Sequence, residues 1–237
     1  MPDEEKDYVK FNNTNSMHLN SELLFSQYAS RYFREGQAVL EIGPAGYPSH
    51  YYNVLNIAGV KWHTLDISSN HIVGGEKNPL HIVSTSEYNY PIDDEQYDVV
   101  ISGQVMEHVK KIWLWIDELK RITKKNGLII IILPVSWTYH AVPVDCWRIY
   151  PDGMRALMED KGLAVVECKF ESLEKKLIPK STPTIPGDET IRLNRHISKK
   201  LKIIFIYNRI ISMIPKIRKL TIPLTVAYDT ICISKKV

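Results

Sequence analysis

The first place where residue types and spacing suggest chemistry is an apolar segment that runs through an acidic residue into a glycine turn, Ala38-Val-Leu-Glu-Ile-Gly-Pro-Ala-Gly46. Its two glycines permit positive φ angles and can bring free backbone N–H groups close to a ligand. Glu41 places a carboxylate at the carboxyl end of the strand. Ala45 and Pro48 stand where the dinucleotide pattern G-x-G-x-x-G requires glycines. The segment therefore predicts a loop for a nucleotide cofactor other than a dinucleotide; an ordinary strand-to-helix turn is the alternative.

A second carboxylate follows the next predicted strand. Residues 60–66 are expected to form that strand, and Asp66 ends it 23 positions after Gly43. An acid at about this distance can bind the ribose hydroxyls of an adenosine. Residues 97–102 then predict a buried strand that leads into a polar turn at 103–109. Because ligands of open α/β sheets bind at the carboxyl ends of the strands, these segments predict a nucleoside site there.

Four segments carry a resemblance to a known family: Glu41-Ile-Gly-x-x-Gly46, Leu65-Asp66, Tyr90-Pro-Ile-Asp-Asp-Glu-Gln-Tyr-Asp98 and Gln104-Val-Met-Glu-His-Val109. Together they resemble the class I S-adenosylmethionine-dependent methyltransferases of the small type-11 domain kind, over residues 37–168. Two positions depart from the family pattern. Tyr47 replaces its third glycine, and Ser86 or Glu87 stands where an acid often follows the third strand.

The resemblance implies S-adenosylmethionine as the cofactor, with contacts at the ends of four strands. In the family, the turn after the fourth strand lies near the methionine end of the cofactor. His108 in that turn is therefore expected to contact the cofactor or to start a helix rather than to act as a base. No metal site is expected. The implied cofactor-binding residues are Glu41, Gly43, Pro44, Ala45, Gly46, Asp66, Ile67, Ser86, Glu87, Tyr88, Ser102, Gly103, Gln104 and His108.

The loop after the predicted strand 128–133 is crowded with aromatic and polar residues and holds the candidate catalytic groups. Methyl transfer to a hydroxyl oxygen needs alignment of the reacting atoms and removal of the hydroxyl proton. His140 is the best candidate for the base, because a neutral imidazole can accept a proton near pH 7. Asp145 could orient that imidazole or bind a substrate hydroxyl, and Arg148 could bind a phosphate or carboxylate. The alternative is local hydrogen bonding, with Asp145 and Arg148 paired to each other.

Alternating strand and helix patterns predict an α/β fold, namely a doubly wound, mostly parallel, seven-stranded sheet of the Rossmann-like methyltransferase type. In the family resembled, the last strand inserts antiparallel beside the fifth. Three regions are expected: a helical N-terminal extension (1–36), a cofactor-binding core (37–168), and a basic region with the last strand packed on the same domain (169–237). The expected helices are 20–34, 48–58, 112–122 (stopped by Asn126-Gly127), 151–161 and 197–214. The expected strands are 38–42, 61–66, 80–84, 97–102, 128–133, 163–170 and 224–234. Residues 171–195 are expected to form a loop or lid.

The composition fits a single domain of this kind. A chain of 237 residues that is 44% hydrophobic can bury one sizeable core. It has no run of about 18 uncharged apolar residues, and its first residues lack the basic-then-apolar order of a signal peptide. A cytoplasmic location is therefore expected. Cys146, Cys168 and Cys232 have no C-x-x-C spacing, so the cysteines predict neither a disulfide framework nor a zinc site.

Charge is divided unevenly along the chain. Residues 169–237 contain 15 Lys/Arg and 5 Asp/Glu, whereas residues 1–168 contain 15 and 22. A basic region of this kind can attract phosphate, nucleic acid or an anionic membrane, so peripheral membrane contact is one possibility. A solvated basic helix face is the alternative.

These observations favour a methyltransferase that acts on a hydroxyl of a small sugar- or nucleotide-linked, phosphate-bearing acceptor. Among the family's substrate classes, sugars of bacterial surface polysaccharides fit best, by analogy at the level of the fold. Three alternatives stay open. They are a small-molecule amine as acceptor, a nucleic-acid base as acceptor, and a non-catalytic nucleotide-binding protein. A nucleic-acid partner is not expected, because the chain has no Asn/Asp-Pro-Pro-Tyr segment.

Overall fold

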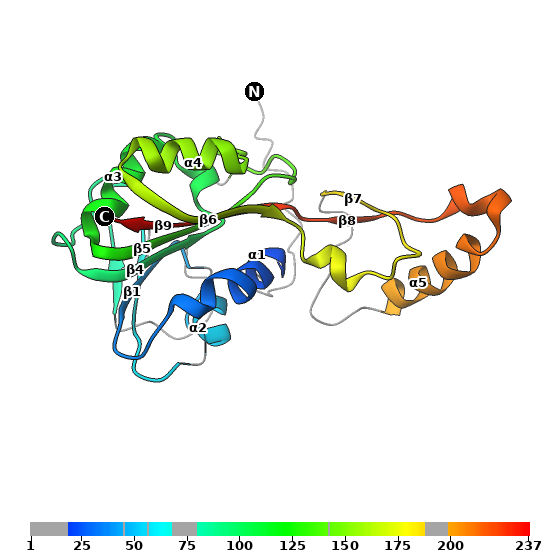
Figure 1. Cartoon of the computed structure of the whole chain (residues 1–237), viewed down its shortest axis with the longest axis horizontal. Coiled ribbons are helices and arrows are strands. Elements are labelled where there is room, and N and C mark those ends of the chain that lie inside the picture. The colour runs from blue at the N-terminus through cyan, green and yellow to red at the C-terminus, as the bar shows by residue number, and fades with distance from the viewer. Residues whose placement is uncertain (1–18, 45, 56, 68–79, 142, 188–198) are drawn as a thin grey trace, which may run out of the picture.

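A seven-stranded sheet forms the centre of the structure, a computed structural model that describes residues 19–44, 46–55, 57–67, 80–141, 143–187 and 199–237 (Figure 1). The strand order is β3-β2-β1-β4-β5-β9-β6, and a separate two-stranded sheet pairs β7 with β8. The strands of the large sheet are β1 (Ala38–Ile42), β2 (Lys61–Asp66), β3 (His81–Val83), β4 (Tyr97–Gly103), β5 (Thr123–Pro134), β6 (Leu163–Glu171) and β9 (Asp229–Lys236).

All neighbours from β3 to β5 pair in parallel, and β9 runs antiparallel between β5 and β6. The predicted fold class is therefore confirmed, including the antiparallel last strand beside the fifth. The central strands read as continuous apolar runs because helices cover both faces of the sheet. Residues 129–133 of β5, for example, have no exposed surface.

Two helical layers cover the sheet. On one face, α3 (Ile112–Ile122) and α4 (Pro151–Asp160) contribute Trp115, Ile116 and Met154 to a core that also contains Leu40 of β1. On the other face lie α2 (His50–Leu55) and a helical segment made of α1 (Leu19–Leu24), a π-helical turn and a 3₁₀ turn that ends at Tyr32. Figure 1 shows α3 and α4 above the sheet and α1 and α2 below it.

Two predicted boundaries are wrong. The helix at 112–122 is not stopped by Asn126-Gly127, because Thr123 already has an extended backbone and its hydroxyl donates to the Leu119 carbonyl at 2.6 Å. Asn126, with a φ of 66°, instead lies within β5, where the register against β4 shifts. The predicted strand 224–234 is two strands, β8 (Leu224–Val226) and β9, because residues 224–226 pair with β7 (Thr184–Pro186) rather than with the large sheet.

The basic region forms a small module at one end of the molecule (Figure 1). It consists of β7, β8, α5 (Lys199–Ser212) and a 3₁₀ segment (Pro215–Leu220), and its core contains Ile178, Leu201, Leu224 and Val226. The segment predicted as a loop at 171–195 thus contains β7 and a 3₁₀ turn (Glu174–Leu177), and its residues 188–195 lie outside the described part of the chain. No helix in the described residues is long and apolar enough to cross a membrane.

One buried side chain joins the N-terminal helix to the far side of the sheet. The Asn20 amide nitrogen donates to the Asp229 carboxylate at 2.7 Å and to the Glu171 carbonyl at 3.0 Å. Its amide oxygen accepts from the Leu173 N–H at 2.6 Å. Asn20 therefore fixes α1 against both the end of β6 and the start of β9.

We expect Asn20→Ala to lower the free energy of unfolding by about 2–4 kcal/mol, because it removes a hydrogen bond to a buried carboxylate and leaves other buried polar groups unpaired. Asn53→Ala is the matched control, since Asn53 is exposed and its one side-chain hydrogen bond within the described part of the chain is a long 3.5 Å contact with the Pro48 carbonyl. That variant should change stability by less than about 0.5 kcal/mol. Urea unfolding of both variants measures the difference, and equal losses would contradict the role given to Asn20.

Candidate functional site

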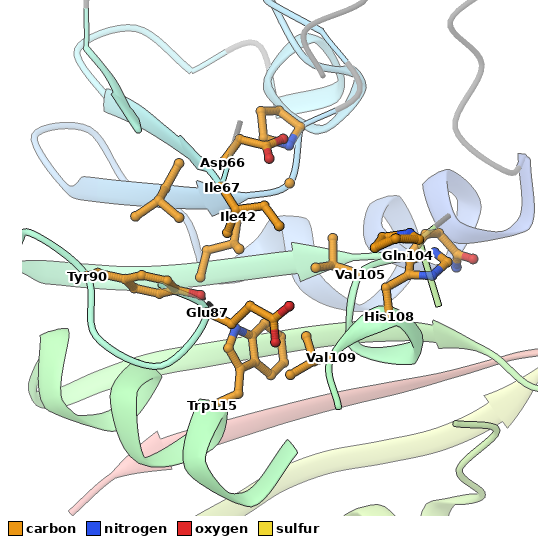
Figure 2. Close-up of a pocket in the computed structure, with 14 residues that line it drawn as sticks. Ile42, Asp66, Ile67, Glu87, Tyr90, Gln104, Val105, His108, Val109 and Trp115 are labelled. Carbon is orange, nitrogen blue, oxygen red and sulfur yellow. Dashed lines mark hydrogen bonds between the residues drawn. The ribbon is translucent and has the colours of Figure 1, made fainter. Parts of the chain in front are cut away.

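A cavity of about 260 Å³ opens at the carboxyl ends of β1, β2 and β4. Figure 2 shows Asp66 and Ile67 on one side of it, Glu87 and Trp115 on the other, and Gln104 and His108 at one end. The position matches the edge where open α/β sheets bind ligands. The lining residues are Ile42, Gly43, Pro44, Leu65, Asp66, Ile67, Glu87, Tyr90, Gln104, Val105, His108, Val109, Trp115 and Pro143.

Gly43 brings two turns of the site close together. Its φ of 65° is left-handed, and a Cβ added there would lie 2.4 Å from a methyl carbon of Val105. A glycine is therefore required both by the turn after β1 and by the approach of the turn after β4. The prediction of free N–H groups at the glycines is wrong for Gly43, because its N–H donates to the Leu65 carbonyl at 2.8 Å.

The cavity combines carboxylates with apolar and aromatic walls. Asp66 ends β2 and is 8% exposed, and Glu87 comes from the segment after β3. Tyr90 and Trp115 form a buried pair, in which the Trp115 indole N–H donates to the Tyr90 hydroxyl at 2.7 Å. None of the lining residues that the structure describes is a lysine or arginine. The lining therefore favours a ligand that is neutral or cationic at the bound part over one that carries a pyrophosphate there.

Several residues that the resemblance implied for the cofactor do not line this cavity. Glu41 is buried behind it and accepts a hydrogen bond from the Trp62 indole at 2.8 Å. Burial raises the pKa of Glu41 to about 7, although bonds from Ser49 and Trp62 lower it in part. Gly103 packs against Tyr51, whose hydroxyl would lie 1.8 Å from an added Cβ. The remaining described residues of this set are Gly46, Ser86, Tyr88 and Ser102; Ala45 lies outside the described residues.

An imidazole pair lies at the His108 end of the cavity. The rings of His108 and His140 meet edge to face, with centroids 5.0 Å apart. His108 Nδ1 lies 2.5 Å from the Val144 carbonyl, and burial lowers the pKa of His108. The loop that carries His140 is held against the turn after β4, because the Trp147 indole N–H donates to the Val109 carbonyl at 2.8 Å.

Asp145 and Arg148 are paired to each other. The two guanidinium nitrogens of Arg148 donate to the two carboxylate oxygens of Asp145 at 2.5 and 2.7 Å. Asp145 also accepts from the His140 backbone N–H at 2.8 Å. Burial alone would raise the pKa of Asp145, but these hydrogen bonds outweigh it and lower the pKa. The pair therefore holds the loop around His140, and neither residue lines the cavity.

Glu107 is a residue of this site that the sequence analysis passed over. It lies in the 3₁₀ turn Met106–His108, has no exposed surface, and its Oε1 is 3.7 Å from His108 Nε2. Burial raises the pKa of Glu107 to about 8, while its own backbone N–H and the charge of Arg148 lower it in part. Its place in the segment Gln104–Val109 was visible in the sequence, but a buried carboxylate cannot be told there from a solvated one. Glu107 does not line the cavity itself, and the lining residues that the sequence did not single out are Ile42, Leu65, Tyr90, Val105, Val109, Trp115 and Pro143.

Comparison with known proteins agrees with this geometry. A protein-family model described as a methyltransferase domain matches residues 40–131. Over these 92 of its 237 residues, the chain is similar to that family. Curated relatives named as uncharacterized methyltransferases, from Mycobacterium bovis and Mycobacterium tuberculosis, are 29% identical over 100 residues, or 40% of this chain. The chain aligns with only 39% of the length of these relatives.

Solved structures share the fold across almost the whole chain. A SAM-dependent methyltransferase from Archaeoglobus fulgidus has a TM-score of 0.55 and 17% identity, and covers 91% of this chain and 92% of its own. A putative methyltransferase complexed with the Trm112 activator from Haloferax volcanii has a TM-score of 0.57 and 15% identity, covering 91% and 90%. Phosphoethanolamine N-methyltransferase 2 from Haemonchus contortus, solved with S-adenosyl-L-methionine, has a TM-score of 0.51 and 14% identity, covering 92% and 52%. At these identities the likeness is one of fold, and the fold is that of the class I methyltransferases.

Proposed function

We propose that this chain is an S-adenosylmethionine-dependent methyltransferase that methylates a hydroxyl group of a small acceptor. The observation that carries the proposal is the cavity itself, in which Asp66 lies beside apolar and aromatic walls within the matched domain. A nucleoside needs such a carboxylate for its ribose hydroxyls and such walls for its base. The lack of a described basic lining residue suits a sulfonium cofactor better than a dinucleotide.

We give the residues around the cavity the following roles. Asp66 and the turn at Gly43 and Pro44 hold the cofactor, and His108 contacts it at the end of the cavity. When bound, S-adenosylmethionine supplies a methyl carbon that its sulfonium activates for displacement. We assign His140 to activation of the acceptor hydroxyl, which must lose its proton. Asp145 and Arg148 position His140 by fixing its loop.

The acceptor we infer is a sugar- or nucleotide-linked compound of the kind used in surface-polysaccharide biosynthesis in the cytoplasm. The imidazole pair supports a hydroxyl over an amine, because an amine does not require a base. Arg148 is already bonded to Asp145 through both guanidinium nitrogens, so it is not the residue that would hold a phosphate on the acceptor. The assignment to polysaccharides rests on analogy of fold.

The cofactor assignment predicts that S-adenosylhomocysteine raises the melting temperature and that NAD does not. Asp66→Ala should weaken S-adenosylhomocysteine binding by about 1–3 kcal/mol, the scale for hydrogen bonds to a charged group. Asp93→Ala, at an exposed aspartate outside the cavity, should leave binding unchanged. Calorimetry on the three proteins measures this. Micromolar binding of NAD without binding of S-adenosylhomocysteine would refute the cofactor.

The assignment of His140 predicts that His140→Ala lowers kcat by about 10²–10⁴ and leaves S-adenosylhomocysteine affinity nearly unchanged. The assay is methyl transfer to the acceptor that a screen of sugar nucleotides identifies, followed by mass spectrometry. His50→Ala is the control, since His50 lies on α2 and pairs with Glu22 away from the cavity. An unchanged kcat in His140→Ala would show that the acceptor is activated elsewhere or is an amine.

The basic module also exposes apolar side chains, and together with its positive charge they favour contact with an anionic membrane surface. Ile203, Ile206, Ile210 and Met213 recur at helical spacing and are 55–68% exposed. Residues 199–228 also contain seven Lys/Arg and no Asp/Glu. Exposed isoleucines flanked only by positive charge suit the interface of an anionic bilayer. A second copy of the chain is a poorer occupant, because it would bring the same seven positive charges to the contact.

We therefore expect the protein to float with phosphatidylcholine vesicles that contain about 30% phosphatidylglycerol and not with phosphatidylcholine alone. Replacing Lys199, Lys200 and Lys202 by Glu should reduce flotation, and raising the salt to about 0.5 M should weaken it in the original chain. Lys125→Glu, at an exposed lysine of β5, is the matched control. If the triple variant binds the anionic vesicles as well as the original chain does, these lysines are only a solvated face of the helix.

A further inference from the structure

Three groups with metal-binding chemistry meet at the end of the cavity. Glu107, His108 and His140 each offer a ligand atom, and these atoms all lie within 4.8 Å of one another. Two of the residues are in the turn after β4 and the third is in the loop after β5. Since β4 and β5 are parallel neighbours, their carboxyl ends place these segments side by side. Residues 32 positions apart in the sequence thus converge on one point.

The two imidazoles are held in the manner of metal ligands. His108 Nδ1 lies 2.5 Å from the Val144 carbonyl, and His140 Nδ1 lies 3.2 Å from the Thr138 carbonyl. A carbonyl can only accept, so in the neutral rings each Nδ1 carries the proton and each Nε2 keeps its lone pair. Histidines that bind metals are oriented by this kind of hydrogen bond from the second ring nitrogen.

The Glu107 carboxylate lacks a hydrogen-bond partner among the residues that the structure describes. Both of its oxygens are buried without a hydrogen bond. The His108 Nε2 at 3.7 Å is too distant for one, and the Arg148 guanidinium is bonded to Asp145 and to backbone carbonyls. A buried carboxyl in this state is costly unless something binds it. A cation between Glu107 and the imidazoles would bind one or both oxygens of the Glu107 carboxylate.

We propose that Glu107, His108 and His140 bind a divalent transition-metal ion, with Zn²⁺ the best match. Two imidazoles and one carboxylate form a donor set of catalytic zinc sites, which keep a fourth position open. Mg²⁺ and Ca²⁺ are disfavoured because they prefer oxygen ligands. Ligand atoms around tetrahedral Zn²⁺ lie about 3.4 Å apart, so atoms now up to 4.8 Å apart would need to approach by as much as about 1.4 Å.

The ion would also explain how the hydroxyl is activated, and this part rests on the proposed function. His108 lies at the end of the cavity where the cofactor's methyl group is proposed to lie, so an acceptor bound beside that group would be within reach of the ion. A hydroxyl oxygen on the ion loses its proton to solvent more easily. Its lone pair can then form the bond to the methyl carbon while the carbon–sulfur bond breaks and its electron pair returns to sulfur. His140 would act as a ligand in this step rather than as the proton acceptor.

Metal binding can be measured without cofactor or acceptor. The 237-residue chain without a histidine tag is stripped with a chelator and titrated with Zn²⁺ alone by calorimetry. We expect one ion per chain with a Kd below about 10 µM. Substitution with Co²⁺ should give visible absorption bands typical of a protein-bound ion. Binding of S-adenosylhomocysteine to the same preparation fails or succeeds independently, so failure of the metal site and failure of the proposed function are distinguishable.

Three variants test which residues bind the ion. His140→Ala and Glu107→Gln should each weaken Zn²⁺ binding at least about tenfold, because each removes a ligand. His140 lies in a partly exposed loop, so its variant is expected to fold, and circular dichroism checks both proteins. His50→Ala is the matched control, because His50 and Glu22 are also 3.7 Å apart but lie outside the cluster. Zn²⁺ affinity that is absent in the original chain, or equal in all four proteins, would overturn the proposal. Full turnover by the stripped protein together with its loss in His140→Ala would also overturn it and leave His140 as a base.

Discussion

The close approach of the turn after β1 to the turn after β4 is the constraint on which the site depends. At Gly43 there is no room for a Cβ, because Val105 occupies that space. The same contact fixes the start of the turn that carries Gln104, Glu107 and His108. A larger residue at position 43 would clash with Val105 and displace this turn, whether or not a ligand is bound. The glycine thus acts on the cavity through packing between two loops, as well as through its left-handed backbone.

The antiparallel strand β9 contacts that turn through a hydrogen bond between Asp229 and Gln104. Asp229, at the start of β9, accepts hydrogen bonds from Asn20 at 2.7 Å and from Gln104 at 3.4 Å. Burial raises the pKa of Asp229 to about 7, although the bonds from Asn20 and Gln104 lower it in part. A buried network of this kind stabilises one arrangement only when its members are all in place. The N-terminal helix, the last strand and the turn beside the cavity are therefore coupled through Asn20, Asp229 and Gln104.

Sequence reasoning succeeded where the signal is local. The strands at 38–42, 61–66 and 97–102 have apolar runs with clear ends, and the motifs that follow them contain Gly43, Asp66 and His108, which line the cavity. It failed where distant pairing decides the outcome. Residues 224–226 leave the large sheet because β7 offers them a partner, and nothing in their own sequence indicates this. Asn126-Gly127 has the composition of a helix stop but lies inside a strand.

The candidate site shows the same limit at the level of single groups. Glu107 and His108 are adjacent in the sequence, but the burial of Glu107 and the absence of a described hydrogen-bond partner depend on packing around the turn. Trp115 and Tyr90 belong to the core and to the cavity wall at once, so an apolar pattern alone cannot assign them to a ligand. For Arg148 and Asp145 the sequence left two roles open, and the structure shows the second of them, in which the two side chains pair with each other.

The positive charge of the chain lies away from the cavity. The described lining residues include two carboxylates, Asp66 and Glu87, and no Lys or Arg, while the basic residues of 199–228 lie in a separate module beyond the end of the sheet (Figure 1). Surface charges more than about 10 Å apart are largely screened at ordinary ionic strength. The basic module therefore affects what reaches the molecule more than it affects the pKa values inside the cavity. Because the basic residues lie elsewhere, the lining has the charge that the proposed cationic cofactor and the proposed ion beside the imidazoles would require.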